Sequence, residues 1–274
     1  MDTKYVCYLF TVYDREKSLI NFVKNYKKFR SGKKHKLIIC FKQIKLTQII
    51  NYRKILKKIK YIEFIDTGTK NDWDFGSYKR VSKTFFDKDI LFLNSHSYPV
   101  CNDWLKKLFK FKKKNTVIAP MASYESMIDS IKLKYKFHKI IRFIWRKIIF
   151  KKNFDNFPNP HIRTSSFLIN SKTFYNFIKN KKLNNKFDTL KIESGKYGLT
   201  KFLKRKNFNI FVVNFDGVKF QEQDWHKSET YNYLKKNKTI ISDKYTRNYS
   251  KLNNLEKRKM RKKTWGKNLI YIYA

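Results

Sequence analysis

The first 119 residues alternate short apolar runs with segments whose apolar residues recur at helical spacing. The runs rich in β-branched and aromatic side chains, which are typical of strands, lie at 4–13, 36–41, 61–65 and 90–93. Helical spacing fills the segments 16–29, 49–59, 77–86 and 104–111, and a short extended run follows at 117–119. This order predicts an α/β fold with right-handed crossovers, a mostly parallel sheet and flanking helices.

The pattern changes after Pro120. Segment 131–150 is rich in cations, and from Phe137 its apolar residues follow helical spacing opposite a basic face. We expect a basic amphipathic helix here, within an insertion at 127–160. It suits the surface of an anionic membrane, while a core helix with a solvated cationic face and a nucleic-acid-binding face stay open.

Beyond the insertion the apolar pattern resumes. We expect strands at 165–169 and 208–214 and helices at 172–178 and 192–203. The domain is expected to span 1–244, with a basic C-terminal extension at 245–274.

The balance of charge is extreme. The chain has 64 Lys and Arg against 21 Asp and Glu, a formal net charge of +43. Codon bias toward A and T would raise Lys, but it would raise Asp and Glu as well. We therefore expect a polyanionic partner, either nucleic acid or an anionic membrane surface.

Several classes of site are excluded by simple patterns. No three glycines fall within one six-residue window, so the dinucleotide-binding motif is absent. The P-loop motif is absent because no Gly-Lys-Ser/Thr follows a Gly five positions earlier. Cys7, Cys40 and Cys101 are widely spaced and form no C-x-x-C pair. We expect no NAD, haem or structural zinc. The cysteine pattern fits a reducing cytoplasm, and no window of about 18 residues is free of charge, so we expect no membrane span. The expected location is cytoplasmic, with the inner face of the membrane as a site of peripheral binding.

Polar residues that follow the strands are the candidates for a site, because ligands of parallel sheets bind beyond the carboxyl ends of the strands. Asn94, Ser95 and His96 directly follow the run at 90–93. Asp72 and Asp74 follow the third strand, beside a helix start, where an Asp can also be an N-cap. Asp87 and Asp89 precede a strand and are expected to be turn residues.

Several strings, in order along residues 4–217, resemble GT-A sugar transferases near the rhamnan synthesis type, which are family 2-like enzymes of bacterial surface polysaccharides. Those strings are 66–68, 72–79, 90–99, 161–169 and 193–200. The resemblance implies a GT-A-like, Rossmann-type fold and an inverting, hexosyl-type transferase. It would move a sugar from an activated nucleotide donor to a glycan or lipid-linked acceptor in surface polysaccharide synthesis.

The same resemblance assigns roles to single residues. It implies Glu193 as the base that removes the acceptor proton. Without it, Glu193 would be a solvent-facing residue in the first turn of a helix, favoured there by the dipole. The remaining roles implied are donor binding by Thr11, Tyr13, Asp14, Asp74, Asn94, Ser95 and His96, and acceptor or phosphate binding by His161, Arg163 and Thr164.

Two departures from the family pattern affect the expected chemistry. The second strand ends in Phe41-Lys42-Gln43, without the acidic residue that would contact the donor base. The position of the metal motif holds Asn94 and His96 in place of carboxylates. His96 is a competent Mn²⁺ ligand, whereas Mg²⁺ prefers anionic oxygen. The expectation is either Mn²⁺ or Mg²⁺ with the nucleotide sugar, or Lys and Arg in place of the metal.

Two other functions compete with sugar transfer. A nucleic-acid-binding protein would use the basic surface and the loop Gly195-Lys196-Tyr197-Gly198, which fits the G-x-x-G pattern of KH domains. A catalytically inactive transferase-like scaffold would account for the altered metal motif. Both alternatives stay open from the sequence.

Overall fold

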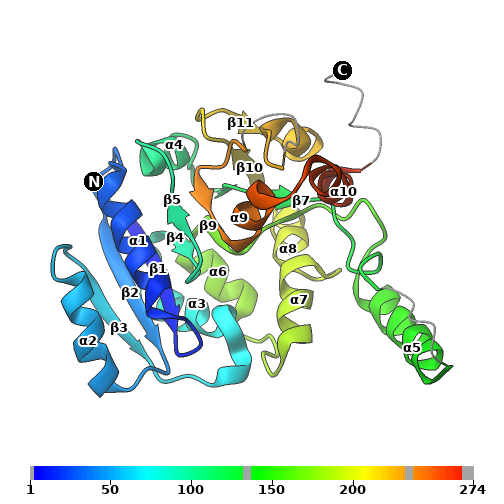
Figure 1. Cartoon of the computed structure of the whole chain (residues 1–274), viewed down its shortest axis with the longest axis horizontal. Coiled ribbons are helices and arrows are strands. Elements are labelled where there is room, and N and C mark those ends of the chain that lie inside the picture. The colour runs from blue at the N-terminus through cyan, green and yellow to red at the C-terminus, as the bar shows by residue number, and fades with distance from the viewer. Residues whose placement is uncertain (1–2, 132–136, 232–236, 267–274) are drawn as a thin grey trace.

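The computed structural model describes residues 3–131, 137–231 and 237–266. Within them an 8-stranded sheet has the order β11-β10-β6-β9-β4-β1-β2-β3 (Figure 1). The strands are β1 Tyr5–Thr11, β2 Lys36–Lys42, β3 Ile62–Asp66, β4 Asp89–Leu93, β6 Thr116–Ala119, β9 Ser166–Asn170, β10 Asn209–Val213 and β11 Lys219–Phe220.

The sheet is mostly parallel. β1 pairs parallel with β2 and β4, β2 with β3, and β6 with β10. β9 is antiparallel to both of its neighbours, and β11 is antiparallel to β10. The predicted α/β class with a mostly parallel sheet is confirmed.

Helices cover both faces of the sheet, because alternate residues of each strand point to opposite sides. One face packs against α1 Glu16–Lys28, α2 Leu46–Leu56 and α4 Trp104–Phe109. The other packs against α3 Trp73–Thr84, α6 Ser171–Ile178, α7 Lys186–Ser194 and α8 Leu199–Arg205.

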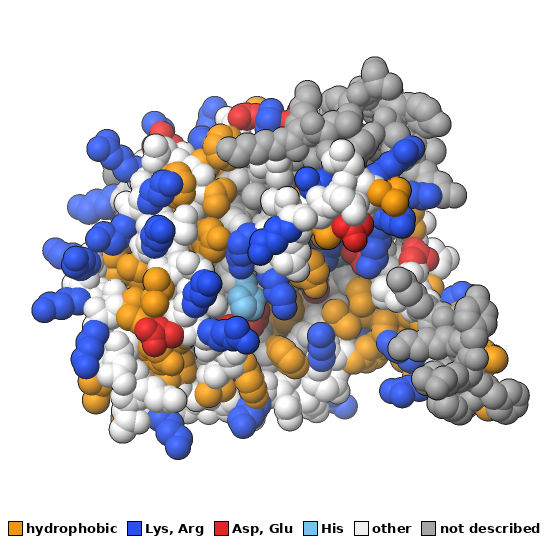
Figure 2. All heavy atoms as spheres, in the orientation of Figure 1, with side chains coloured by type: hydrophobic (Ala, Val, Ile, Leu, Met, Phe, Trp, Pro, Cys, Tyr) orange, Lys and Arg blue, Asp and Glu red, His pale blue; other side chains and the backbone are white. Residues whose placement is uncertain are grey.

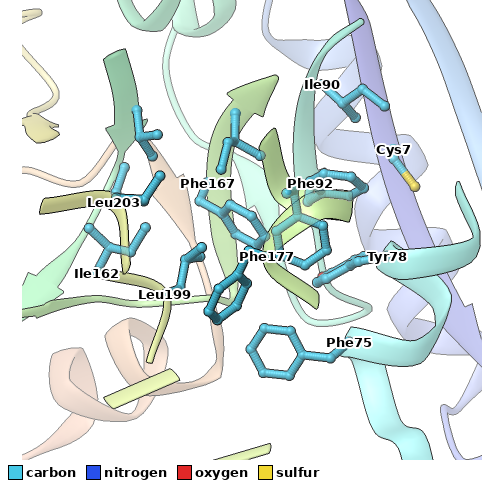
Figure 3. Packing of buried hydrophobic residues seen from close by; sticks show 14 of the residues in the cluster. Cys7, Phe75, Tyr78, Ile90, Phe92, Ile162, Phe167, Phe177, Leu199 and Leu203 are labelled. Carbon is cyan, nitrogen blue, oxygen red and sulfur yellow. The ribbon is translucent and has the colours of Figure 1, made fainter. Parts of the chain in front are cut away.

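Aromatic rings fill the centre of the second core (Figure 3). Tyr78 of α3 lies 4.7 Å from Phe92 of β4, and Phe92 lies 5.3 Å from Phe167 of β9, between ring centroids. This packing fixes α3 against the two strands whose ends carry candidate site residues.

The prediction of a single helix over 192–203 is wrong, because the helical structure is interrupted between α7 and α8. A Cβ on Gly195 would lie 2.5 Å from the Lys191 carbonyl oxygen, and one on Gly198 would lie 2.9 Å from the Gly195 carbonyl oxygen. The two glycines therefore allow a tight turn between the helices, in which Gly198 N donates to the Gly195 carbonyl at 2.8 Å. This packing accounts for the G-x-x-G pattern without a nucleic-acid ligand.

The C-terminal residues fold onto the domain. They form α9 Lys244–Lys251 and α10 Asn254–Trp265. Trp265 is 2% exposed and belongs to the core between the sheet and helices α3, α6, α7 and α8. Tyr124 N donates to the Thr264 carbonyl at 2.8 Å. Residues 267–274 lie outside the described part of the chain.

Short elements complete the fold. β5 Tyr98–Pro99 pairs with β12 Ile241–Ser242, and β7 Ala122–Ser123 pairs with β8 His161–Ile162. The 3-10 helices are η1 Lys70–Asp72 and η2 Glu222–Ser228, and helix α5 spans Phe137–Asn153. The first part of the predicted basic helix, 132–136, lies outside the described residues. In the described ranges no helix has both the length and the apolar character needed to cross a membrane.

Candidate active site

The ends of five chain segments meet at the carboxyl edge of the sheet. Strands β1, β2, β3 and β4 all finish there because they are parallel. Strand β9 is antiparallel, so its beginning lies at the same edge, with Ser166 opposite Leu93. Asn94 N donates to the Ser165 carbonyl at 2.9 Å. Because β9 is antiparallel, residues 163–165, which precede it, lie at the same edge of the sheet as the polar residues that follow β4. The sequence predicted the site at this edge.

A cavity of about 540 Å³ opens at this edge. Every residue for which the resemblance implied donor binding lines it, although these residues come from three separate parts of the chain. The complete lining is Thr11, Tyr13, Asp14, Arg15, Lys17, Ser18, Asn21, Lys42, Lys70, Trp73, Asp74, Asn94, Ser95, His96 and Lys244.

Asp14 is the centre of the hydrogen bonds in the cavity wall. Its Oδ2 accepts from Thr11 N at 2.8 Å and from Thr11 Oγ1 at 2.7 Å. Its Oδ1 accepts from Ser95 Oγ at 2.7 Å, and His96 Nε2 lies 3.8 Å away. Both oxygens of this buried carboxylate are engaged. Asp14 therefore ties the end of β1 to the loop after β4 and positions His96.

Asn94 builds the turn after β4. Its Oδ1 accepts from Ser97 Oγ at 2.8 Å and from His96 N at 3.2 Å. The His96 side chain is 40% exposed, so it faces the cavity freely. Within this loop, Asn94 shapes the backbone and His96 presents the imidazole.

Asp74 is a carboxylate in an unfavourable environment. Burial first, and then the nearby charge of Asp14, raise the pKa of Asp74 to about 6. The charge of Glu193 also contributes to this rise in pKa, whereas Lys42 and a hydrogen bond from Asn94 act against it. Perturbed carboxyl groups of this kind cluster at functional sites.

A buried ion network supports the wall behind Asp74. Asp72 binds both Lys42 Nζ and Arg80 Nη1, the latter at 2.7 Å. Arg80 also donates to Asp66, at 2.5 Å from Nε and 2.8 Å from Nη2. Burial raises the pKa of Asp66, but hydrogen bonds from Arg80, Ser77 and the Gly68 N–H outweigh it and leave the pKa lowered.

Gly76 makes this network sterically feasible, since a Cβ there would lie 2.0 Å from the Asp72 carboxyl carbon. Asp72 occupies the N-cap position of α3 but makes no capping hydrogen bond. The Asp72 and Asp74 pair is therefore divided between an internal ion network and the cavity.

Glu193 lies beside the cavity without lining it. It belongs to the last turn of α7, not to the first turn of a helix as the sequence indicated. Its Oε1 accepts from Thr164 N and from Thr164 Oγ1, both at 3.0 Å. The negative charge of Glu193 raises the pKa of Asp74, of His161 and of Arg163. All three groups therefore interact electrostatically with Glu193.

His161 and Arg163 lie deeper in the fold. Burial, and next the charge of Arg163, lower the pKa of His161 to about 4, so its ring is neutral at pH 7. Its Nδ1 pairs with the Asn159 carbonyl at 2.8 Å. Arg163 Nη2 donates to Glu125 at 3.0 Å, which is the structural pairing that a loop Arg commonly makes. Neither side chain lines the cavity.

Of the two Asp residues at the other edge, Asp87 lies in a turn as expected, whereas Asp89 is the first residue of β4 and not a turn residue. Asp87 has a positive φ of 55°, and Asp89 pairs with Lys112 at 3.0 Å. Both lie at the amino end of β4, away from the cavity.

The site does not fit a divalent metal ion. In the part of the chain that the structure describes, no three His, Cys, Asp or Glu side chains are grouped to hold one. Both oxygens of Asp14 are bound by Thr11 and Ser95, and the amide oxygen of Asn94 is bound within its own turn. Among the described residues of the lining, this leaves His96 with Asp74, whose pKa is raised to about 6, and no third ligand of this kind.

The lining includes residues that the sequence reasoning missed. These are the cations Arg15, Lys17, Lys42, Lys70 and Lys244, together with Ser18, Asn21 and Trp73. Lys244 comes from α9, 148 positions after His96 by the numbering, so no local pattern could indicate it. Trp73 has a positive φ of 48°, a strained value for a bulky residue, and is 43% exposed. A Trp held in this way offers a ring for stacking.

Comparison with known proteins gives structural likeness only. The chain matches no protein-family model and no curated protein. Among solved structures it is similar to the WbbM bifunctional glycosyltransferase, with 10% identity, a TM-score of 0.41, and coverage of 76% of this chain and 37% of that chain. It is also similar to the apo-form glycosyltransferase GlyE of Streptococcus pneumoniae TIGR4, with 12% identity, a TM-score of 0.42, and coverage of 76% and 44%.

A further similar structure is 4-diphosphocytidyl-2C-methyl-D-erythritol synthase from Anaerococcus prevotii DSM 20548. It has 13% identity and a TM-score of 0.43, with coverage of 83% of this chain and 96% of that chain. The chain spans less than half the length of the two glycosyltransferases. At these identities and TM-scores, the function has to be inferred from the geometry of the cavity.

Proposed function

We propose that the protein is a glycosyltransferase that binds an activated nucleotide sugar in the cavity at the carboxyl edge of the sheet. The observation that carries the proposal is the convergence of Asp14, Asp74 and His96, from three parts of the chain, in one basic cavity beside Glu193. Its volume of about 540 Å³ falls in the range of small-molecule sites.

Cations of the lining are suited to the donor diphosphate. Lys70 and Lys244 are exposed, come from two different elements and border the same cavity, whereas Lys42 is already engaged by Asp72. Hydrogen bonds from ammonium groups to phosphate oxygens are charge-assisted, and they are stronger than hydrogen bonds between neutral groups. In the proposed reaction Lys70 and Lys244 neutralise the charge that develops on the leaving diphosphate.

Two aromatic side chains at the rim are suited to the nucleoside. Tyr13 is 63% exposed and Trp73 is 43% exposed, and both line the cavity. Base stacking on aromatic rings is favourable for every base. We place the nucleoside between these rings and the diphosphate toward His96.

Glu193 is the proposed base. The acceptor oxygen attacks the anomeric carbon, the bond from that carbon to the diphosphate oxygen breaks, and the acceptor proton passes to the Glu193 carboxylate. The products are the glycosylated acceptor and a nucleoside diphosphate. Thr164 holds Glu193 through one oxygen, which leaves the other oxygen for the acceptor. The proposed acceptor is a glycan or lipid-linked sugar of a surface polysaccharide, and the proposed outcome is inversion.

The test is hydrolysis of nucleotide sugars by the purified protein. A panel of uridine, guanosine, thymidine and cytidine donors is incubated with and without Mn²⁺, and release of nucleotide is measured. Release with at least one donor, lost in Glu193→Gln, is the expected result. Binding of a donor without any release, in the presence of a range of sugar acceptors, would favour the inactive scaffold.

A further inference from the structure

Helix α5 exposes a wide apolar face. Six large apolar side chains on it are between 38% and 63% exposed, and Trp145 is the most exposed of them. They form two adjacent rows at a spacing of four residues, which places both rows on one side of a helix. The rows are Ile140, Ile144 and Ile148, and Ile141, Trp145 and Ile149.

Cations border this face on both sides. Arg142 and Arg146 continue one flank, and Lys147 and Lys151 continue the other, at the positions next to the two rows. The sequence of α5 contains no acidic residue. An apolar sector between two basic flanks is the pattern of a helix that lies in the plane of an anionic membrane.

The helix is fixed to the domain by its last turns. Phe150 is 7% exposed, and beyond the end of the helix Phe154 is 1% exposed. Their rings lie 5.3 Å apart, and Phe150 lies 5.2 Å from Phe187 of α7. Figure 1 shows α5 standing away from the sheet, with its other end free of the central layers. The packed C-terminal end of α5 therefore holds its apolar face away from the sheet.

We infer that α5 is a docking arm for the surface of an anionic lipid bilayer. The exposed isoleucines and Trp145 would enter the boundary between headgroups and acyl chains, and the flanking Arg and Lys would contact anionic headgroups. With 17 residues and cations on both flanks, α5 lies along a bilayer instead of crossing it.

The net charge of the chain favours an anionic bilayer over a second copy of the chain as the partner of the apolar face of α5. Each copy carries +43, and among the residues that Figure 2 colours, Lys and Arg side chains are many and acidic side chains few on the face shown. Pairing two copies through α5 would bring their basic flanks together, which is repulsive. An anionic bilayer satisfies the apolar rows and the flanks at the same time.

The first test is sedimentation of the full chain with two kinds of vesicle, phosphatidylcholine alone and phosphatidylcholine mixed with phosphatidylglycerol. We expect binding to the mixed vesicles only, weakened when salt is raised because the Debye length falls from about 10 Å at 0.1 M to about 3 Å at 1 M. The double variant Ile144→Ser and Ile148→Ser should bind the mixed vesicles more weakly than wild type, by a factor of roughly ten or more. The matched control is Ile50→Ser, which changes an exposed isoleucine of α2.

The second test locates the contact. Brominated lipids in the mixed vesicles quench a Trp that enters the bilayer, and Trp145 and Trp73 are both substantially exposed. Quenching should be lost in Trp145→Phe and kept in Trp73→Phe. Equal binding of the double variant and wild type, or quenching that survives Trp145→Phe, would overturn the inference. A dimer in solution that the double variant abolishes would assign the face to a second copy instead.

Discussion

Glu193 Oε1 accepts hydrogen bonds from both the backbone N and the hydroxyl of Thr164, each at 3.0 Å. Glu193 lies in the last turn of α7, where the helix dipole disfavours a negative charge. Thr164 precedes β9, so its two bonds attach the end of α7 to the edge of the sheet. A carboxylate held against the dipole by two directed bonds is consistent with the proposed base.

Glu193→Gln should lower turnover by about two to four orders of magnitude, because the amide keeps the size and the oxygen that faces Thr164 but cannot take a proton. Affinity for the donor should be unchanged. The melting temperature should stay equal or rise slightly, since the substitution removes a charge that the dipole disfavours. Measurement combines steady-state kinetics, donor titration and thermal unfolding.

The matched control is Glu222→Gln, which changes a Glu of η2 that pairs with Lys204 at 2.7 Å, away from the cavity. It should retain full turnover. A Glu193→Gln protein that also keeps full turnover would remove Glu193 from the mechanism.

Asp74→Asn should stabilise the fold at neutral pH. The pKa of Asp74 rises from 3.8 to about 6 in the folded protein, so the folded state holds this proton more tightly than the unfolded state. The stability that the proton supplies is present below pH 4 and is lost as the pH rises through 6. The Asn variant does not titrate, so its free energy of unfolding should exceed the wild-type value by roughly 1–3 kcal/mol above pH 6.

The check is denaturant unfolding of both proteins from pH 3.5 to 8. The two curves should meet at the acid end and separate between pH 4 and 6. A constant difference over the whole range would mean that Asp74 does not carry the shifted pKa. The stabilised variant is expected to bind donor poorly, as is common where a site is strained.

His96→Ala and Asn94→Ala should have different effects. The His96 side chain is 40% exposed, so its removal should weaken donor binding roughly tenfold with no change in melting temperature. Asn94 Oδ1 accepts from Ser97 Oγ and His96 N, and its loss should lower the free energy of unfolding by roughly 1–2 kcal/mol.

Calorimetry and donor titration on the two single variants distinguish the roles. Unaltered donor affinity in His96→Ala would remove His96 from the site.

Much of the fold could be predicted because its signals are local. The strand at 36–41 and the helix at 16–29 depend on the periodicity of their own side chains, and both are present within a residue or two. Asn94 and His96 could be located because they directly follow a strand. Local patterns do not give the direction of β9, which brings Thr164 to the edge of the sheet where the cavity opens. The steric conflict at Gly195 and Gly198 that divides α7 from α8 appears only in three dimensions.

Sequence patterns cannot place Lys244 at the cavity, because it lies far along the chain from the other lining residues. It reaches the cavity from α9, whose start is fixed by the capping box of Asp243 and Thr246. Because Asp14 and Asn94 are engaged in hydrogen bonds, we propose that cations, Lys244 among them, replace a divalent metal ion at the diphosphate.

Turnover should therefore persist in EDTA, and Lys244→Met should weaken binding of nucleoside diphosphate roughly tenfold. Lys251→Met, at the other end of the same helix, is the matched control and should bind like wild type. The readouts are calorimetric titration with a nucleoside diphosphate in EDTA and turnover with and without Mn²⁺. Turnover that disappears in EDTA and returns with Mn²⁺ would show that a metal ion does this work, with His96 as its first ligand to test.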